Sequence, residues 1–380
     1  MRAVRTDGSP AAVERLAQAL AAALTGGPAV HIGDGATSSA CQSRPDPGAE
    51  AALVVETSGS TGVARRVVLS AAALRASAMA THARLGGPGR WLLALPAHHV
   101  AGTQVIVRAL LAGRPPTVLD IRGGFRTDSF ATAAAGLPAS GRRYTSLVPT
   151  QLHRVLTDPR ANQALRSFDA VLVGGAATSP ALLTAARGSG LNVVTTYGMS
   201  ETAGGCVYDG LPLDGVRVRL GPDDRIELAG PMLASGYLGD RAATESAFVD
   251  GWFRTSDLGH WDGHELIVLG RADDVITTGG ESVHPAAVER VLAAQPGVRA
   301  ACVVGVPDLE WGQLVVAAVV VVDAATERPA REAWAAAVRA ELGPRSVPRR
   351  VRVVAELPLR GVGKPDRAAV ARLLSETVGP

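Results

Sequence analysis

The sequence predicts an α/β protein with two domains, a large layered domain over residues 1–270 and a small α+β domain over residues 271–380. Up to about residue 200, short apolar runs alternate with helical patterns, which is typical of a largely parallel sheet covered by helices. After residue 270 the chain continues for about 110 residues with its own strands and helices, which is enough for a separate domain.

The large domain begins with a helix from Ser9, because Ser caps helices and Pro10 fits their first turn. A loop rich in Gly, Ser, Pro and Asp follows over residues 33–50. Short apolar runs then predict strands over residues 52–55, 67–69, 91–95, 116–119, 144–148, 170–173 and 192–196. Helical patterns predict helices over residues 70–84, up to 111, from 149 and over 180–186.

The texture changes after Arg217, where short strands separated by turns predict a small β subdomain over residues 217–220, 225–228 and 265–269. Beyond Gly270 we expect strands over residues 275–277, 300–306, 314–322 and 351–354, with helices over 285–295, 330–342 and from 366. The apolar run Val315–Val322 is too short to cross a membrane and fits a buried strand.

Composition excludes several classes of protein. The chain has 38 basic and 35 acidic residues and no Lys/Arg block, so we expect no nucleic-acid partner. The three cysteines, Cys41, Cys206 and Cys302, are odd in number and far apart, which predicts neither a disulfide framework nor a zinc site. No secretory leader and no membrane-spanning run is present, so we expect no membrane insertion and a cytoplasmic protein.

One glycine-rich stretch, Thr57-Ser58-Gly59-Ser60-Thr61-Gly62-Val63-Ala64-Arg65, follows an apolar strand. Its glycines bring backbone N–H groups close to a ligand, and its hydroxyls and arginine add donors and charge, which suits a polyphosphate. It is not a Walker loop, because it has no Gly-Lys-Ser/Thr. A plain turn between two strands is the alternative interpretation.

Two more loops, Gly174-Gly175-Ala176-Ala177 and Tyr197-Gly198-Met199-Ser200-Glu201-Thr202, also come directly after strands. Because ligands in α/β sheets bind at the carboxyl ends of strands, the three loops predict one composite site.

Further signatures follow in the order Gly236-Tyr237, Thr255-Ser256-Asp257, Gly270-Arg271-Ala272-Asp273-Asp274, Gly279-Gly280-Glu281 and Gly363-Lys364. Together with the three loops they resemble the adenylate-forming superfamily, which includes acyl- and aryl-CoA synthetases, luciferases and peptide-synthetase adenylation domains. The resemblance covers roughly residues 50–370. It implies the adenylate-forming enzyme fold, with a shortened amino-terminus and a small mobile carboxy-terminal domain.

A narrower resemblance covers residues 91–102, 144–147, 196–215 and 361–367, which look like the o-succinylbenzoate–CoA ligases of actinobacterial menaquinone biosynthesis. It implies that ATP and a carboxylate form an acyl-adenylate and pyrophosphate, and that CoA then displaces AMP. Another aryl- or acyl-CoA ligase is the first alternative. A catalytically silent nucleotide- or acyl-binding protein is the second, because Ala64, Arg65, His98 and Ser256 depart from the usual family residues.

The resemblance also implies roles in ATP binding. Glu201 would hold Mg²⁺, Asp257 the ribose hydroxyls, Arg271 the ribose or phosphate, and Ser200 the α-phosphate. Tyr197 and Gly198 would face adenine together with the backbone of Gly174, Gly175 and Ala176. The β- and γ-phosphates would be held by Thr57, Ser58, Gly59, Ser60, Thr61, Gly62 and Arg65, where Arg65 replaces the usual lysine but keeps its charge.

For catalysis, Lys364 would bridge the attacking carboxylate and the α-phosphate, and the small domain would then swing about Asp273 to bring Gly279 and Gly280 to the CoA arm. His99 would line the acyl pocket, and Gly204 and Gly205 would leave space for an aromatic ring. The acid's second carboxylate would bind Arg143, Thr150, Gln151 or Ser200. The expected partners are an aryl carboxylic acid, ATP and CoA, and a homo-oligomer stays open.

Outside this context the same residues have plainer interpretations. Glu201 and Asp257 could cap turns, and Lys364 could be a solvated charge. Cys206 follows Glu201 closely, but the sequence places no base beside it, so we interpret it as a buried thiol.

Overall fold

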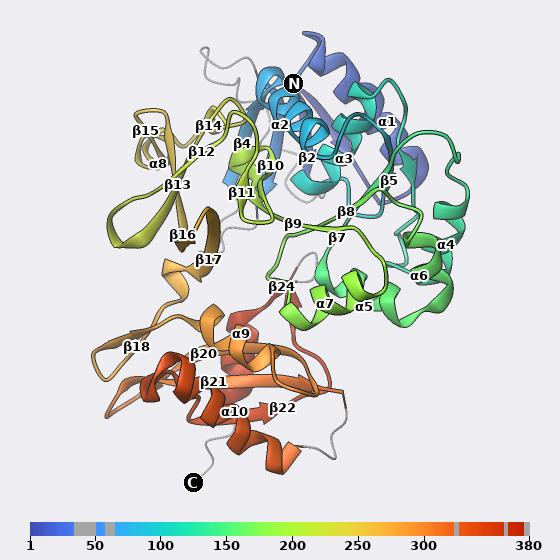
Figure 1. Cartoon of the computed structure of the whole chain (residues 1–380). Helices are drawn as coiled ribbons and strands as arrows, with labels where there is room; N and C mark the ends of the chain where they lie inside the picture. Colours follow the sequence, from blue (N-terminus) through green and yellow to red (C-terminus); the bar gives the residue numbers. More distant parts are fainter. Residues whose placement is uncertain (34–50, 58–64, 323–326, 361–363, 376–380) are drawn as a thin grey trace.

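The computed structural model describes residues 1–33, 51–57, 65–322, 327–360 and 364–375. Figure 1 shows a large amino-terminal part above a smaller carboxy-terminal part, which meet beside strand β17. This arrangement confirms the predicted α/β fold with a large and a small unit.

The first sheet has five strands in the order β1-β2-β3-β4-β14. These are β1 (Arg2–Arg5), β2 (Val30–Gly33), β3 (Ala51–Thr57), β4 (Arg65–Ser70) and β14 (Gly236–Tyr237). The first three are parallel, whereas β4 runs antiparallel to both β3 and β14. Thr57 and Arg65, the first and last residues of the glycine-rich stretch, pair directly across β3 and β4. Residues 58–64 themselves lie outside the described residues.

The second sheet has seven strands in the order β11-β10-β9-β8-β7-β5-β6. These are β5 (Arg90–Leu93), β6 (Thr117–Val118), β7 (Arg143–Leu147), β8 (Ala170–Val173), β9 (Val193–Met199), β10 (Gly204–Tyr208) and β11 (Leu211–Pro212). Strands β5 to β9 are parallel, as predicted, and β10 folds back antiparallel to β9. This return explains why β9 extends to Met199, beyond the predicted end, since Gly204 pairs with Met199.

Helices cover both faces of the second sheet. α1 (Pro10–Leu24), α2 (Ala71–Arg84) and α3 (Val100–Leu111) fill the space between the two sheets. α4 (Thr127–Ala135), α5 (Pro149–Thr157), α6 (Pro159–Leu165) and α7 (Pro180–Gly188) cover the opposite face. Strand β5 shows the two cores directly, because Trp91 and Leu93 are buried on one side and Leu92 on the other. Helices α4 and α6 were not predicted.

The predicted β subdomain is confirmed as a third sheet. Its strands are β12 (Arg217–Leu220), β13 (Arg225–Ala229), β15 (Phe248–Val249), β16 (Trp252–Asp262) and β17 (Glu265–Arg271), and α8 (Arg241–Ala247) precedes β15. Strand β16 was not predicted, and it pairs with β13, β15 and β17.

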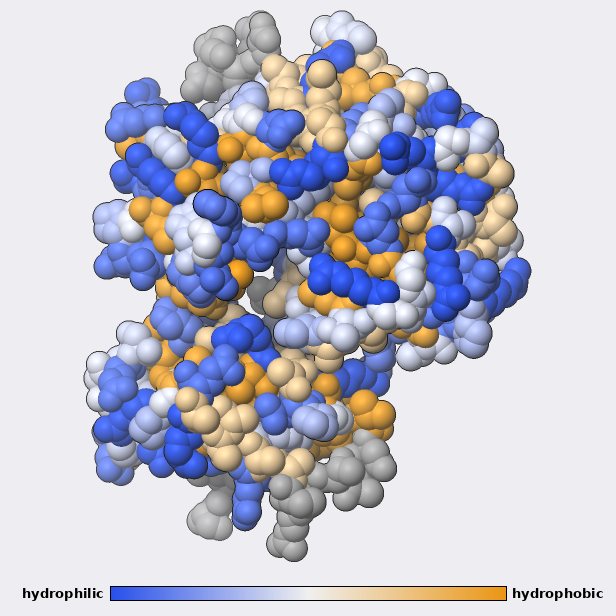
Figure 2. All heavy atoms as spheres, in the orientation of Figure 1, coloured by the Kyte–Doolittle hydropathy of each residue, from blue (hydrophilic) through white to orange (hydrophobic). Residues whose placement is uncertain are grey.

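The small carboxy-terminal unit has a sheet of β18 (Ile276–Thr278), β19 (Glu281–Val283), β20 (Val298–Asp308), β21 (Gly312–Val321) and β22 (Arg350–Val353). α9 (Pro285–Ala293) and α10 (Glu327–Leu342) pack on one face, and α11 (Arg367–Ser375) packs on the other. The short strands β23 (Leu359–Arg360) and β24 (Lys364–Pro365) pair with each other. On the face in Figure 2, a recess separates the small unit from the large one.

The domain boundary after residue 270 stays a prediction, because β17 continues to Arg271 and the short helix η4 (Ala272–Asp274) leads into β18. In the described part of the chain, no helix combines the length and the apolar character that a membrane crossing requires.

Candidate active site

Glu201 is presented by a tight turn at the end of β9. It lies in the short 3₁₀ helix η2 (Ser200–Thr202), between two antiparallel strands. The Thr202 hydroxyl accepts from the Met199 N–H at 3.0 Å and donates to the Gly204 carbonyl at 2.7 Å, and Thr202 is fully buried. The Glu201 carbonyl accepts from the Ala234 N–H at 2.8 Å. The backbone on both sides of Glu201 is therefore fixed.

The Glu201 side chain joins the first and second sheets. The Tyr237 hydroxyl donates to Glu201 Oε1 at 3.0 Å, and the Arg65 guanidinium lies over the Tyr237 ring, 5.1 Å from its centroid. Burial raises the pKa of Glu201, whereas hydrogen bonds and the charges of Arg65 and Arg271 oppose that rise. Glu201 is thus a carboxylate that is removed from solvent and has cations around it.

A second buried carboxylate, Asp257, comes from β16. Tyr197 at the end of β9 donates to Asp257 Oδ2 at 2.8 Å, and Arg271 stands opposite Asp257 on β17. Burial raises the pKa of Asp257, against the hydrogen bond from Tyr197 and the charges of Arg271 and Lys364. Thr255 fixes this part of β16, since its hydroxyl donates to the Ile226 carbonyl at 2.8 Å and accepts from the Asp257 N–H at 3.0 Å.

Lys364 reaches this cleft from the small unit. It is close enough for its charge to lower the pKa of both His99 and Asp257. His99 lies at the start of α3, with its ring 4.3 Å from that of His98 between centroids. The structure therefore brings Lys364, His99, Asp257 and Tyr197 into one region, although they come from distant parts of the sequence.

Lys364 is also the only lysine in the chain, among 38 basic residues. All the other Lys or Arg positions are arginine. The compact, flexible ammonium group of lysine therefore occurs at one position only. The lysine count was not used in the sequence prediction, although it points to the same residue as the Gly363-Lys364 motif.

Glycines bring the backbone close together beside Tyr197. A Cβ atom on Gly174 would lie 2.2 Å from Thr196 Oγ1, and one on Gly198 would lie 2.2 Å from the Gly204 carbonyl oxygen. Only glycine fits these contacts, which let the end of β8, at Gly174 to Ala176, lie against β9. The segments that the sequence predicts to face adenine therefore lie in close backbone contact.

The structure separates the four predicted partners of the acid's second carboxylate. Ser200 and Thr150 follow the carboxyl ends of β9 and β7, at the cleft edge of the sheet. Arg143 does not, because it begins β7 at the opposite edge, where its side chain donates to the Pro138 carbonyl at 3.1 Å. The prediction for Arg143 is corrected on this ground.

Gln151 is a structural residue in this fold. Its amide donates to the Ala94 carbonyl at 2.9 Å and accepts from the Val148 N–H at 3.0 Å, and the side chain is buried. Both ends of the amide thus hold the ends of β5 and β7, so we withdraw Gln151 as a ligand of the acid.

Gly204 and Gly205 lie in β10, paired with Met199 and Gly198 at the site. Gly279 and Gly280 form the turn between β18 and β19 of the small unit, where a Cβ atom on Gly279 would lie 2.8 Å from the Trp311 ring. The predicted hinge residue Asp273 is half-exposed and pairs with Arg271 at 2.6 Å. Of the predicted phosphate loop, only Thr57 and Arg65 are among the described residues.

Sequence reasoning left out three residues that hold the site together, Thr202, Tyr237 and Thr255. All three stood inside recognised motifs, which was a usable signal.

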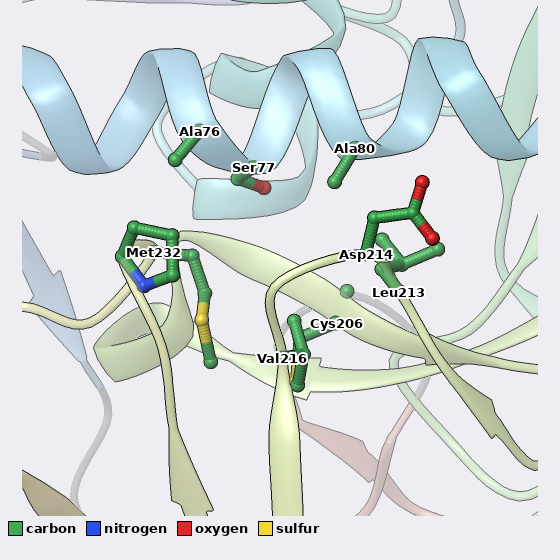
Figure 3. A pocket seen from close by; sticks show the side chains of 10 residues that line it. Ala76, Ser77, Ala80, Cys206, Leu213, Asp214, Val216 and Met232 are labelled. Carbon is green, nitrogen blue, oxygen red and sulfur yellow. The ribbon is translucent and has the colours of Figure 1, made fainter.

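Figure 3 shows a small cavity between α2 and β10, lined by Ser77, Cys206, Leu213 and Met232 among others. Of the predicted site residues, Gly205 alone lines it. Burial raises the pKa of the Cys206 thiol to about 12, so this cysteine is not a nucleophile at neutral pH. The interpretation of Cys206 as a buried thiol is consistent with this.

Among the described residues, no cluster of three or more His, Cys, Asp or Glu side chains could hold a metal ion. A lone buried carboxylate such as Glu201 nevertheless fits Mg²⁺, which keeps several waters and binds one or two carboxylates together with substrate phosphates. The donor set therefore fits a metal that arrives with a nucleotide.

Comparisons with known proteins agree with this geometry. Residues 5–237 match the family model described as AMP-binding enzyme, and residues 287–364 match the model of the AMP-binding enzyme C-terminal domain. The chain belongs to the AMP-binding enzyme family, and its fold is that of the adenylate-forming enzymes.

Individual relatives narrow the comparison. The chain is 50% identical over 327 residues to a probable 2-succinylbenzoate–CoA ligase of Mycobacterium tuberculosis, which covers 85% of this chain and 84% of that protein. The amide bond synthetase McbA from Marinactinospora thermotolerans is similar, with a TM-score of 0.77, 30% identity, and coverage of 91% and 75%. The o-succinylbenzoate coenzyme A synthetase from Bacillus subtilis, in complex with AMP, gives a TM-score of 0.71, 27% identity, and coverage of 84% and 68%.

The position of Lys364 can be tested through the titration of His99. Burial, His98 and Lys364 together lower the pKa of His99 to about 4, so its ring should stay neutral at pH 5.5. In Lys364→Ala the pKa should rise, because one cation is gone, but it should stay below 6.5 because burial is the largest cause. NMR titration of the imidazole measures this, and an unchanged pKa in the variant would contradict the placement.

Proposed function

We propose that this protein is an ATP-dependent acid–thiol ligase that converts 2-succinylbenzoate to its CoA thioester through an acyl-adenylate. The observation that carries the chemistry is the convergence of Glu201, Asp257 and Lys364 at the carboxyl end of β9. The choice of acid rests on the relative that is 50% identical over most of both chains.

The nucleotide would lie along the end of β9. Tyr197 uses Oδ2 of Asp257, so Oδ1 can accept the ribose hydroxyls, and the backbone from Gly174 to Ala176 offers a flat surface for adenine. Tyr237 uses Oε1 of Glu201, so Oε2 can bind the Mg²⁺ of a metal–ATP complex. Arg65, above Tyr237, would face the β- and γ-phosphates.

Adenylation would depend on charge and position. A carboxylate oxygen of the acid attacks the α-phosphorus, the bond to the bridging oxygen breaks, and pyrophosphate leaves with the electron pair. Lys364 would lie between the two anions and reduce their repulsion as they meet. His99 is neutral at physiological pH, so it can line the acid pocket without competing with Lys364 for the carboxylate.

Thioester formation would follow when the CoA thiolate attacks the acyl carbon and AMP leaves with the carboxylate oxygen. A free thiol such as that of CoA has a pKa of about 8.5, so a few per cent thiolate is present at neutral pH. The small domain would turn about Asp273 to bring the Gly279–Gly280 turn to the cleft.

The substrate assignment predicts a defined set of products. Purified protein with ATP, Mg²⁺, CoA and 2-succinylbenzoate should release pyrophosphate and AMP in equal amounts and form one CoA thioester. For comparison, pyrophosphate release is measured with a panel of benzoates, medium-chain fatty acids and dicarboxylic acids in place of 2-succinylbenzoate. Faster turnover of another acid would overturn the substrate, and nucleotide binding without pyrophosphate release would overturn the ligase itself.

The role of Lys364 predicts a split between the two half-reactions. Lys364→Ala should reduce pyrophosphate release by about a hundredfold or more, since it removes a charge aimed at the transition state. It should leave thioester formation from supplied acyl-adenylate and CoA within about threefold of the wild type, because this ammonium takes no part in that step. Equal losses in both half-reactions would refute the assignment.

A further inference from the structure

Arg367, three residues after Lys364, uses its whole guanidinium within the small unit. Its Nη1 and Nη2 bind the two oxygens of Glu289 at 2.7 and 3.0 Å, in a bidentate pair. Nη1 also donates to the Val303 carbonyl at 2.6 Å, and Nε pairs with Asp274 at 3.0 Å. One side chain therefore connects α9, β20 and the residue next to the predicted hinge.

The network is more than a surface ion pair. The Arg367 side chain is 27% exposed and Glu289 is 16% exposed, and bidentate arginine–carboxylate pairs in such surroundings are strong and directional. Glu289 Oε1 also accepts from the Val303 N–H at 2.7 Å. Arg367 stands at the start of α11, where a cation is unfavourable for the helix dipole, so its two carboxylate partners outweigh a local cost.

The position of Lys364 depends on the same residue. Only Pro365 and Asp366 separate the two, so the Cα atoms can lie no more than about 11 Å apart. Pro365 restricts the backbone between them, and Asp366 caps α11 through the Ala369 N–H at 3.1 Å. The pairing of β24 with β23 adds two residue pairs, and the Arg367 guanidinium attaches the same segment to α9 and β20 of the small unit.

We propose that Arg367 is a positioning residue for adenylation, which holds the Lys364 segment and the hinge-adjacent Asp274 to one body. Lys364 then keeps a fixed place relative to the pivot, and rotation of the small unit moves it into or out of the cleft as a whole. This inference rests on the proposed function for its kinetic consequence, although the anchoring itself can be measured without turnover.

The test uses four full-length variants. Arg367→Met removes the charge at similar volume, and Arg367→Lys keeps the charge without the fork. Asp274→Asn weakens only the contact next to the hinge and leaves the Glu289 pair intact. Arg290→Met is the matched control, because it breaks a 2.7 Å ion pair with Glu341 in the same unit, between α9 and α10.

The first readout needs no activity. Because Lys364 is the only lysine, protein labelled with ¹³C-lysine gives one ε-methylene signal in an NMR spectrum. Arg367→Met should move this signal to the position and narrow width of a solvated lysine, whereas Arg290→Met should leave it unchanged. An unchanged signal in folded Arg367→Met would overturn the proposal, even if the wild type proved to adenylate no acid.

The second readout is the ratio of the two half-reactions. Arg367→Met should lower the kcat of pyrophosphate release by tenfold or more with little change in the KM for ATP, because misplacement by about 1 Å can cost a hundredfold. Thioester formation from supplied acyl-adenylate should stay within threefold of the wild type. For Arg367→Lys and Asp274→Asn, the kcat of pyrophosphate release should lie between those of the wild type and Arg367→Met. These two variants carry the test if Arg367→Met fails to fold. Equal losses in both half-reactions would show a purely structural role and overturn the proposal.

Discussion

Two buried carboxylates in one cleft form the constraint on which the rest of this structure depends. Burying a charge is costly unless hydrogen bonds and opposite charges compensate for it. Glu201 accepts a hydrogen bond from the Tyr237 hydroxyl, and Asp257 accepts one from the Tyr197 hydroxyl. Burial raises the pKa of each carboxylate, and nearby cations oppose that rise. The cations come from three places, namely Arg65 in the first sheet, Arg271 at the end of the third, and Lys364 in the small unit.

The three cations belong to two different units of the fold. In the proposed rotation of the small unit, Arg65 and Arg271 would stay with the large unit, so the carboxylates would keep partners. Lys364 is the cation that can leave, and the chain has no other lysine. The predicted pivot Asp273 itself pairs with Arg271, and the Asp274–Arg367–Glu289 network follows it directly, so the proposed rotation would take place between these two sets of contacts.

The sequence predicted the layered fold, because apolar runs of strand length and capped helices are local signals, as at Ser9, which caps α1 as expected. It predicted Tyr197 as a loop residue, and this was wrong, because the extension of β9 depends on the return of β10, which is a pairing over distance. Arg143 and Gln151 failed as ligands for a similar reason. The hydrogen-bond partners of their side chains follow from the sheet edge at which each residue lies and from the backbone carbonyls nearby, and neither can be read from the local sequence. The Arg367 network likewise joins segments up to 93 residues apart, and no local pattern reveals it.

The central claim is that the acid is activated as an adenylate in this cleft. The most direct measurement is the fate of ¹⁸O in 2-succinylbenzoate labelled in its carboxylates. Attack of a carboxylate oxygen on the α-phosphorus, followed by displacement with CoA, must leave one ¹⁸O in AMP and none in pyrophosphate. Mass spectrometry of AMP after complete turnover should therefore show one heavy oxygen per molecule of thioester. Unlabelled AMP, or label in a phosphate product, would contradict the account.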